Sequence, residues 1–189
     1  MKKFKPIIIV AGEPNSIFSE IFFKALKKKF KSPLILIASK KLLKLQMKKL
    51  KYKKKINLLD YKKLSEYKLN NRSINLINID YNTSRAFEKI STKSNSYIKK
   101  SFAVAFYILK SGITNKFVNG PITKRTFLKK KYLGITEYIS KKFKINNSAM
   151  LIYNKDLSVC PITTHLPLKL VNKKINKKII SDKIKLITS

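Results

Sequence analysis

The sequence is poor in several residue types on which specialised sites depend. Its 189 residues include one cysteine, one histidine, four glycines and no tryptophan. The single cysteine, Cys160, excludes an intrachain disulfide and a site made of several thiolates, and it fits a reducing cytoplasm. The single histidine, His165, excludes a histidine cluster within one copy of the chain.

Long apolar runs are also missing. Lysines at positions 2, 3 and 5 precede an apolar run at residues 7–11. That run is too short for the core of a signal peptide and far too short for a membrane span. We interpret it as a buried first strand, and we expect a cytoplasmic protein with no membrane partner.

Acidic residues are scarce, with 9 against 44 basic residues and a net charge of +35. This charge suggests nucleic acid or an anionic surface as a partner. Only Arg72, Arg85 and Arg125 are arginine, however, and reading of base edges favours the bidentate guanidinium. Abundant lysine with little glycine and tryptophan is typical of an AT-rich genome. We therefore favour compositional bias, expect no specific nucleic acid partner, and keep a basic nucleic-acid-binding module as the alternative.

Three lysine runs, at residues 27–29, 53–55 and 129–131, stand out within this excess. They can form an electropositive face, but few aromatic residues are interleaved with them in the manner of a stacking surface. We interpret the runs as solvated helix faces.

What is present favours a folded α/β domain, since 44% of the residues are hydrophobic and 11% are aromatic. Apolar runs typical of strands alternate with helical patterns, which predicts a mostly parallel sheet with helices on both faces. The predicted strands are residues 7–11, 34–38, 74–79 and 117–119, and an antiparallel hairpin is predicted from residues 149–153 and 158–163.

The helices can be placed by their caps and apolar spacing. Ser16 is expected to cap a first helix with the stripe Ile17, Ile21, Ala25 and Leu26, and Ser39 a second. A third helix begins at Ser94 or Ser96 and ends at Gly112, a basic helix begins near Thr123, and a last one covers residues 173–187. Residues 52–71 are expected to be irregular.

Candidate chemistry is sparse, and each signal has an ordinary structural alternative. His165 follows a hydroxyl-rich strand end, where a neutral imidazole can bind a metal, but a lone histidine is more often structural. Thr136 and Glu137 follow Gly134 at a helix start that can hold a phosphate or simply be capped. The turn at Gly12 lies at the carboxyl end of the first strand and lacks the glycine spacing of a dinucleotide motif. We expect Gly12, Thr136 and His165 to converge on one edge of the sheet.

Four motif blocks in this order resemble the 4-hydroxythreonine-4-phosphate dehydrogenase family. They are Gly12-Glu13-Pro14, Asn119-Gly120-Pro121-Ile122-Thr123-Lys124, Gly134-Ile135-Thr136-Glu137-Tyr138 and Thr163-Thr164-His165-Leu166-Pro167-Leu168. The resemblance covers residues 1–189 as the N-terminal portion of such an enzyme. It implies an isocitrate/isopropylmalate dehydrogenase-like α/β fold that is incomplete here, with the C-terminal half absent.

The resemblance also implies an activity, which is NAD-dependent oxidation of a phosphorylated hydroxy amino acid, followed by decarboxylation, in vitamin B6 biosynthesis. It implies a divalent metal (zinc, magnesium or cobalt) and a homodimer. It makes His165 a metal ligand and Thr136 a substrate contact, and it suggests Lys124 for the phosphate charge. Ile135 replaces a histidine of the family motif and cannot hydrogen-bond the substrate.

The resemblance implies a metal site made of three histidines, and a chain with a single histidine cannot complete it. From the resemblance we therefore expect a fragment or split gene product that is inactive alone. A non-catalytic remnant of the enzyme fold is a further alternative.

Overall fold

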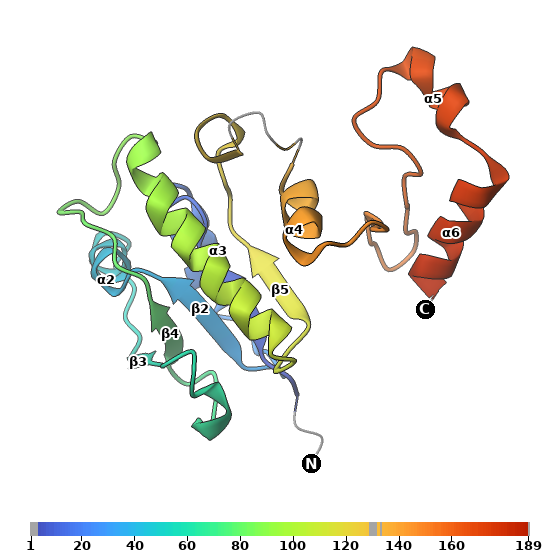
Figure 1. The fold of residues 1–189 in the computed structure, drawn as a ribbon. Helices are drawn as coiled ribbons and strands as arrows, with labels where there is room; N and C mark the ends of the chain where they lie inside the picture. The colour runs from blue at the N-terminus through green and yellow to red at the C-terminus, as the bar shows by residue number, and fades with distance from the viewer. Residues whose placement is uncertain (1–3, 129–131, 133, 189) are drawn as a thin grey trace. The chain divides into compact units, whose positions relative to one another are not determined.

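The computed structural model describes residues 4–128, 132 and 134–188, and the chain divides into two compact units, Met1–Phe127 and Leu128–Ser189. Figure 1 shows the order of the elements along the chain.

The first unit consists of five strands and their connecting helices. Its elements are β1 (Ile7–Val10), α1 (Phe18–Ala25), β2 (Leu34–Ala38), α2 (Lys40–Lys49), β3 (Ile56–Leu58), the 3₁₀ turn η1 (Leu64–Glu66), β4 (Ile74–Asn78), the 3₁₀ turn η2 (Thr92–Ser94), α3 (Asn95–Lys110) and β5 (Lys116–Asn119). A π-helical turn, η3 (Lys124–Leu128), stands where a basic helix was predicted near Thr123.

The five strands form one sheet in the order β3-β4-β2-β1-β5, and every pairing between neighbours is parallel. Ile8 of β1 pairs with Ile35 of β2 on one side and with Phe117 of β5 on the other. Strands β1 and β2 are continuous apolar runs, as expected of parallel strands that are buried on both faces. The α/β class and the parallel sheet are therefore confirmed.

Helices cover both faces of this sheet. On one face, Phe22 and Phe23 of α1 and Leu43 of α2 belong to one buried cluster with Ile9 and Leu36. On the other face, α3 contacts β1, β2 and β5, and its Phe102 lies 6.0 Å from Phe117 between ring centroids. Figure 1 shows α3 running across the sheet.

The predicted inward face of α1 is wrong. Ile17 and Ile21 are 63% and 52% exposed, whereas Phe22 and Phe23 are buried. The helix is apolar on most of its sides, so spacing alone cannot decide which side meets the sheet. The larger aromatic side chains occupy the core because they remove more apolar surface from water.

The predicted caps hold in part. Ser39 precedes α2 and its side chain accepts a hydrogen bond from Leu42 N at 3.3 Å, as expected for an N-cap. Helix α1 begins at Phe18, one residue later than a cap at Ser16 predicts. The Ser16 hydroxyl still accepts a hydrogen bond from Phe18 N at 3.3 Å, and it donates to the Glu13 carbonyl at 2.7 Å. Helix α3 begins at Asn95, and Gly112 follows its end with φ +77°.

One strand was missed. Strand β3 lies within residues 52–71, which were expected to be irregular, and pairs with β4 at the edge of the sheet. A strand of three residues is too short to show the alternation of apolar and polar side chains by which a strand is recognised in a sequence.

The second unit contains three helices, α4 (Ile135–Phe143), α5 (Leu168–Lys174) and α6 (Lys177–Thr188). The predicted hairpin is reduced to one antiparallel bridge between Ile152 and Val159. The C-terminal helix predicted at residues 173–187 is present from residue 177 onward as α6, whereas residues 173 and 174 belong to α5. The two helices are separate because Ile175 is extended and the Asn176 side chain accepts a hydrogen bond from Ile179 N at 3.0 Å. An asparagine cap thus begins a new helix. Within the described residues, no helix has the length and apolar character needed to cross a membrane.

Candidate functional site

The first two motif blocks meet at the carboxyl ends of β1 and β5. Gly120 N donates to the Val10 carbonyl, and Glu13 N donates to the Pro121 carbonyl, both at 2.7 Å. Gly12 has φ +75°, and a Cβ atom there would lie 2.9 Å from the Gly120 carbonyl oxygen and closer still to that of Pro121. The two turns can approach this closely because neither glycine carries a side chain.

We expect Gly12→Ala to lower the free energy of unfolding by about 2–5 kcal/mol, from the left-handed backbone and from the close contact. Gly112→Ala is the matched control, since Gly112 has φ +77° and nothing within 4 Å of the added Cβ. It should cost only about 1–2 kcal/mol. Urea denaturation of both variants measures the difference, and equal losses would show that the turns can separate freely.

Glu13 has a structural place in this turn. Its side chain is buried and accepts hydrogen bonds from Ser94 Oγ at 2.8 Å and from Asn15 N at 3.4 Å. The cavity beside it measures only about 10 Å³, which is room for about one water molecule. Burial also raises the pKa of Tyr97, which lines the same cavity. These contacts tie the turn to the start of α3.

Lys124, the residue suggested for phosphate charge, is exposed at the first position of η3. It belongs to the first unit, as does Gly12, whereas Thr136 and His165 belong to the second. Convergence of Gly12 with Thr136 and His165 therefore stays a prediction.

The last two motif blocks meet within the second unit. Helix α4 begins after Gly134, which places Thr136 and Glu137 in its first turn. His165 Nε2 lies 3.9 Å from Glu137 Oε1. Glu137 Oε2 is buried without a hydrogen-bond partner, and a Cβ atom on Gly134 would lie only 2.9 Å from it. The glycine thus leaves space for a carboxylate that faces the histidine.

His165 has an unusual backbone. Its φ is +57°, in the left-handed region that costs a residue other than glycine about 1–2 kcal/mol. Its side chain is 40% exposed, so the imidazole is open to a ligand. Strain of this kind is concentrated at functional sites.

A small cavity lies beside this pair, at the start of α4. It measures about 60 Å³ and is lined by Thr136, Glu137, Ser148, Met150, Pro161, Ile162, Thr164 and Lys183. The Lys183 ammonium group donates to the Ser148 carbonyl. Three hydroxyl groups, an ammonium group and the N-terminus of a helix are donors suited to an anionic group.

Sequence reasoning did not single out Glu137 as a partner of His165, nor Lys183 as a cavity residue. The sequence did offer a sign that Glu137 could be functional, because the chain has only nine acidic residues and this one lies in a motif block. Lys183 had none, because it is one of 44 basic residues and lies in a different helix from Thr136.

The pair is compatible with a divalent cation. Zinc binds imidazole nitrogen at about 2.0–2.1 Å and carboxylate oxygen at about 2.0–2.2 Å, so one nitrogen and one oxygen ligand of the same ion lie no more than about 4.3 Å apart. The 3.9 Å between His165 Nε2 and Glu137 Oε1 is within that limit. No group of three or more histidine, cysteine or acidic side chains that could hold a metal occurs in the part of the chain that the structure describes.

Solved structures show the same fold. The chain superposes with a TM-score of 0.82 on a 4-hydroxythreonine-4-phosphate dehydrogenase from Burkholderia phymatum, at 20% identity, over 96% of this chain and 56% of that one. A putative 4-hydroxythreonine-4-phosphate dehydrogenase from Salmonella typhimurium gives 0.83 at 19% identity, over 97% and 58%. At these identities the likeness establishes the fold.

Sequence relatives carry the same description. The chain is 31% identical over 186 residues to the 4-hydroxythreonine-4-phosphate dehydrogenase of Sulfurihydrogenibium sp. (strain YO3AOP1), which covers 96% of this chain and 56% of the relative. The corresponding protein of Colwellia psychrerythraea is 25% identical over 172 residues, 89% of this chain and 52% of that protein. The chain spans about half the length of the curated relatives that it matches. Residues 29–189 match the family model described as "Pyridoxal phosphate biosynthetic protein PdxA", and the chain belongs to that family.

Proposed function

We propose that this chain supplies part of the active site of an NAD-dependent 4-hydroxythreonine-4-phosphate dehydrogenase of vitamin B6 biosynthesis. The observation that carries the proposal is the meeting of His165 and Glu137 beside the cavity at the start of α4. Two motif blocks of the family are far apart in the sequence and become neighbours in space. The family membership of residues 29–189 supports the same conclusion.

In the proposed reaction Thr136 binds the substrate through its hydroxyl group at the N-terminus of α4. The adjoining cavity of about 60 Å³ has room for about four to six water molecules on the scale used for the cavity beside Glu13, so it accepts a single anionic group of the substrate and not the whole molecule. Lys124 is proposed to add positive charge toward the phosphate. Ile135 offers the substrate no hydrogen bond, which weakens binding relative to the family histidine.

His165 is proposed as one ligand of a divalent metal such as zinc, magnesium or cobalt. Glu137 is either a second ligand or the carboxylate that orients the imidazole, and both roles are common around metal-bound histidines. When bound, NAD would supply hydride acceptance and the metal would supply polarisation of the substrate hydroxyl group. The proposed working form is a cytoplasmic homodimer in which residues beyond this chain provide the remaining metal ligands.

We expect the chain to bind Co²⁺ weakly through His165 and Glu137. His165→Ala should lower the affinity at least about 10-fold, and Glu137→Gln about 10-fold, the effect typical of losing a partner of a ligating histidine. Absorption spectra of Co²⁺ titrations measure both changes.

Asp156→Asn is the matched control for Glu137→Gln, because it also removes one carboxylate from the second unit, at an exposed turn. Its affinity should equal that of the unaltered chain. If all three variants bind Co²⁺ alike, the His165 and Glu137 pair is not a metal site.

A further inference from the structure

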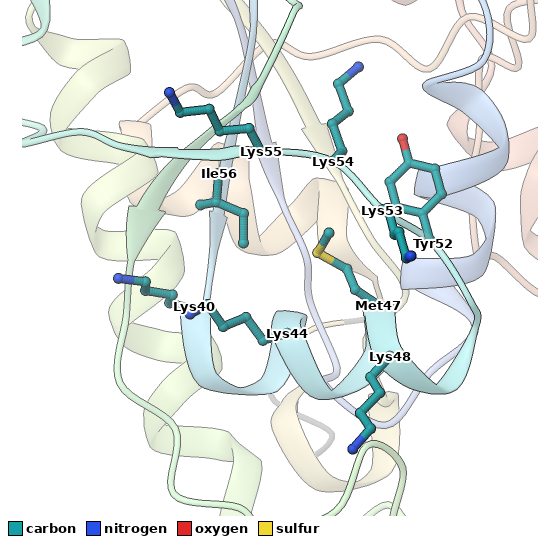
Figure 2. A pocket seen from close by; sticks show the side chains of 9 residues that line it. All are labelled: Lys40, Lys44, Met47, Lys48, Tyr52, Lys53, Lys54, Lys55 and Ile56. Carbon is teal, nitrogen blue, oxygen red and sulfur yellow. The ribbon is translucent and has the colours of Figure 1, made fainter.

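Six lysines surround a hollow of about 820 Å³ in the first unit, which we call the basic groove (Figure 2). It lies between helix α2 and the segment at residues 52–56, and it is lined by Lys40, Lys44, Met47, Lys48, Tyr52, Lys53, Lys54, Lys55 and Ile56. The α2 lysines recur every fourth residue and therefore share one side of the helix. The other three are consecutive in the segment that leads into β3.

The charge of this groove is not neutralised by the protein. Of the described residues that line it, none is acidic. None of its six lysines forms an ion pair with a carboxylate in the described ranges 4–128, 132 and 134–188. Like charges held together repel one another, and a polyanion relieves that repulsion.

The floor of the basic groove is apolar and ordered. Figure 2 shows the side chains of Met47 and Ile56 pointing toward each other between α2 and the segment above it. The Tyr52 ring stacks on Phe23 with the centroids 4.3 Å apart and the planes at 6°. A flat, supported ring beside apolar side chains is a surface on which a nucleobase can stack.

A second basic hollow of about 420 Å³ adjoins the first, and Lys54 lines both. The other residues around it are Leu26, Lys27, Lys28, Lys29, Phe30, Asn71 and Arg72. Phe30 is 38% exposed there. The positive surface therefore extends beyond the size of one small anion, and each hollow offers an aromatic ring.

We propose that the basic groove and the adjoining hollow bind the phosphodiester backbone of single-stranded nucleic acid without sequence preference. Lysines along the margin neutralise phosphates, and Tyr52 and Phe30 receive unpaired bases. A duplex keeps its bases stacked inside, so it would leave these rings unused. Two of the three lysine runs of the sequence thus lie on one surface instead of on separate solvated faces, while residues 129–131 lie outside the described residues.

The test is a fluorescence anisotropy titration of the full chain with single-stranded oligonucleotides of RNA and DNA at several salt concentrations. The groove variant carries Lys44→Gln, Lys48→Gln and Lys55→Gln. The control variant carries Lys93→Gln, Lys99→Gln and Lys100→Gln, which removes the same charge from exposed positions at η2 and α3. Helix α3 lies on the opposite face of the sheet from α2.

We expect the groove variant to show a salt dependence of log affinity shallower by about 2 units, since each phosphate contact on a single strand contributes about 0.7. Its affinity at about 0.1 M salt should fall on the order of 100-fold. The control should retain both the slope and the affinity of the unaltered chain. Tyr52→Leu should weaken binding to single strands while leaving the salt slope unchanged.

Three results would overturn the proposal. Equal losses in the groove and control variants would show that net charge alone acts, as compositional bias implies. Binding of duplex at least as tight as of single strands would exclude base stacking in the groove. Competition by inorganic phosphate at concentrations with little effect on ionic strength would identify a small-anion site.

Discussion

Joining this chain to the remaining part of the Sulfurihydrogenibium enzyme should restore NADH production from 4-phosphohydroxythreonine, and His165→Ala in that chimera should abolish it. A metal that polarises the reacting hydroxyl is worth several kcal/mol, so losing one of its ligands should lower kcat/KM by at least about 10³-fold. Steady-state rates with added Zn²⁺, Mg²⁺ or Co²⁺ measure the loss. Lys169→Ala, an exposed change near His165 in sequence, is the control and should leave the rate unaltered.

The same assay separates the enzyme from its alternatives. The chain alone should produce no NADH, because it has one histidine and one cysteine, and catalytic zinc sites generally need three protein ligands. NADH production by the chain alone, lost on chelation and in His165→Ala, would contradict this expectation. A chimera that folds and binds Co²⁺ but stays inactive would favour a non-catalytic remnant.

Ile135→His in the active chimera should raise kcat/KM, because it restores a polar partner for the substrate. A buried polar group left unpaired costs about 1–3 kcal/mol, so the expected gain is about 5-fold to 150-fold. An unchanged rate would show that the isoleucine is compensated elsewhere in the site.

Phe102→Ala should cause one of the largest losses of stability in the first unit. Phe102 is fully buried in α3, and its ring lies within 6.0 Å of the rings of Phe106, Phe117 and Phe127. Its truncation removes one of two aromatic contacts between α3 and Phe117 of β5, the other being that of Phe106, and leaves a cavity. Such a change costs about 3–5 kcal/mol for a buried phenylalanine. The free energy of unfolding from urea denaturation measures this loss.

Tyr107→Ala is the matched control, an aromatic residue of the same helix that is 52% exposed. Its ring makes an edge contact with that of Tyr61, with the centroids 5.4 Å apart. We expect a loss below about 1 kcal/mol, as is usual for surface positions. Similar losses in both variants would mean that α3 does not pack through Phe102.

The local elements of the fold were predictable where one pattern dominated. Strand β2 is an apolar run of the length that a buried parallel strand requires, and β4 is apolar at three of its five positions. Helix α3 combines an apolar stripe around Phe102 with a terminating Gly112. The apolar pattern of α1 did not decide whether its isoleucines or its phenylalanines face the sheet, and the pattern of β3 was too short to be recognised. The division between α5 and α6 was not predictable, because an asparagine such as Asn176 can lie inside a helix or cap the start of a new one.

By itself, the sequence determined the α/β class, the order of the four motif blocks and the candidates His165, Thr136 and Lys124, because composition, periodicity and motifs are local properties. Only the tertiary structure decided that Glu137 faces His165. It also decided that Gly12 and Gly120 allow two turns to come into contact. The same holds for the groove that the lysines of α2 and of residues 53–55 surround. These facts depend on which segments distant in the chain become neighbours. Which distant segments become neighbours depends on the packing of helices on the sheet and on close backbone contacts, and a local sequence pattern does not contain that information.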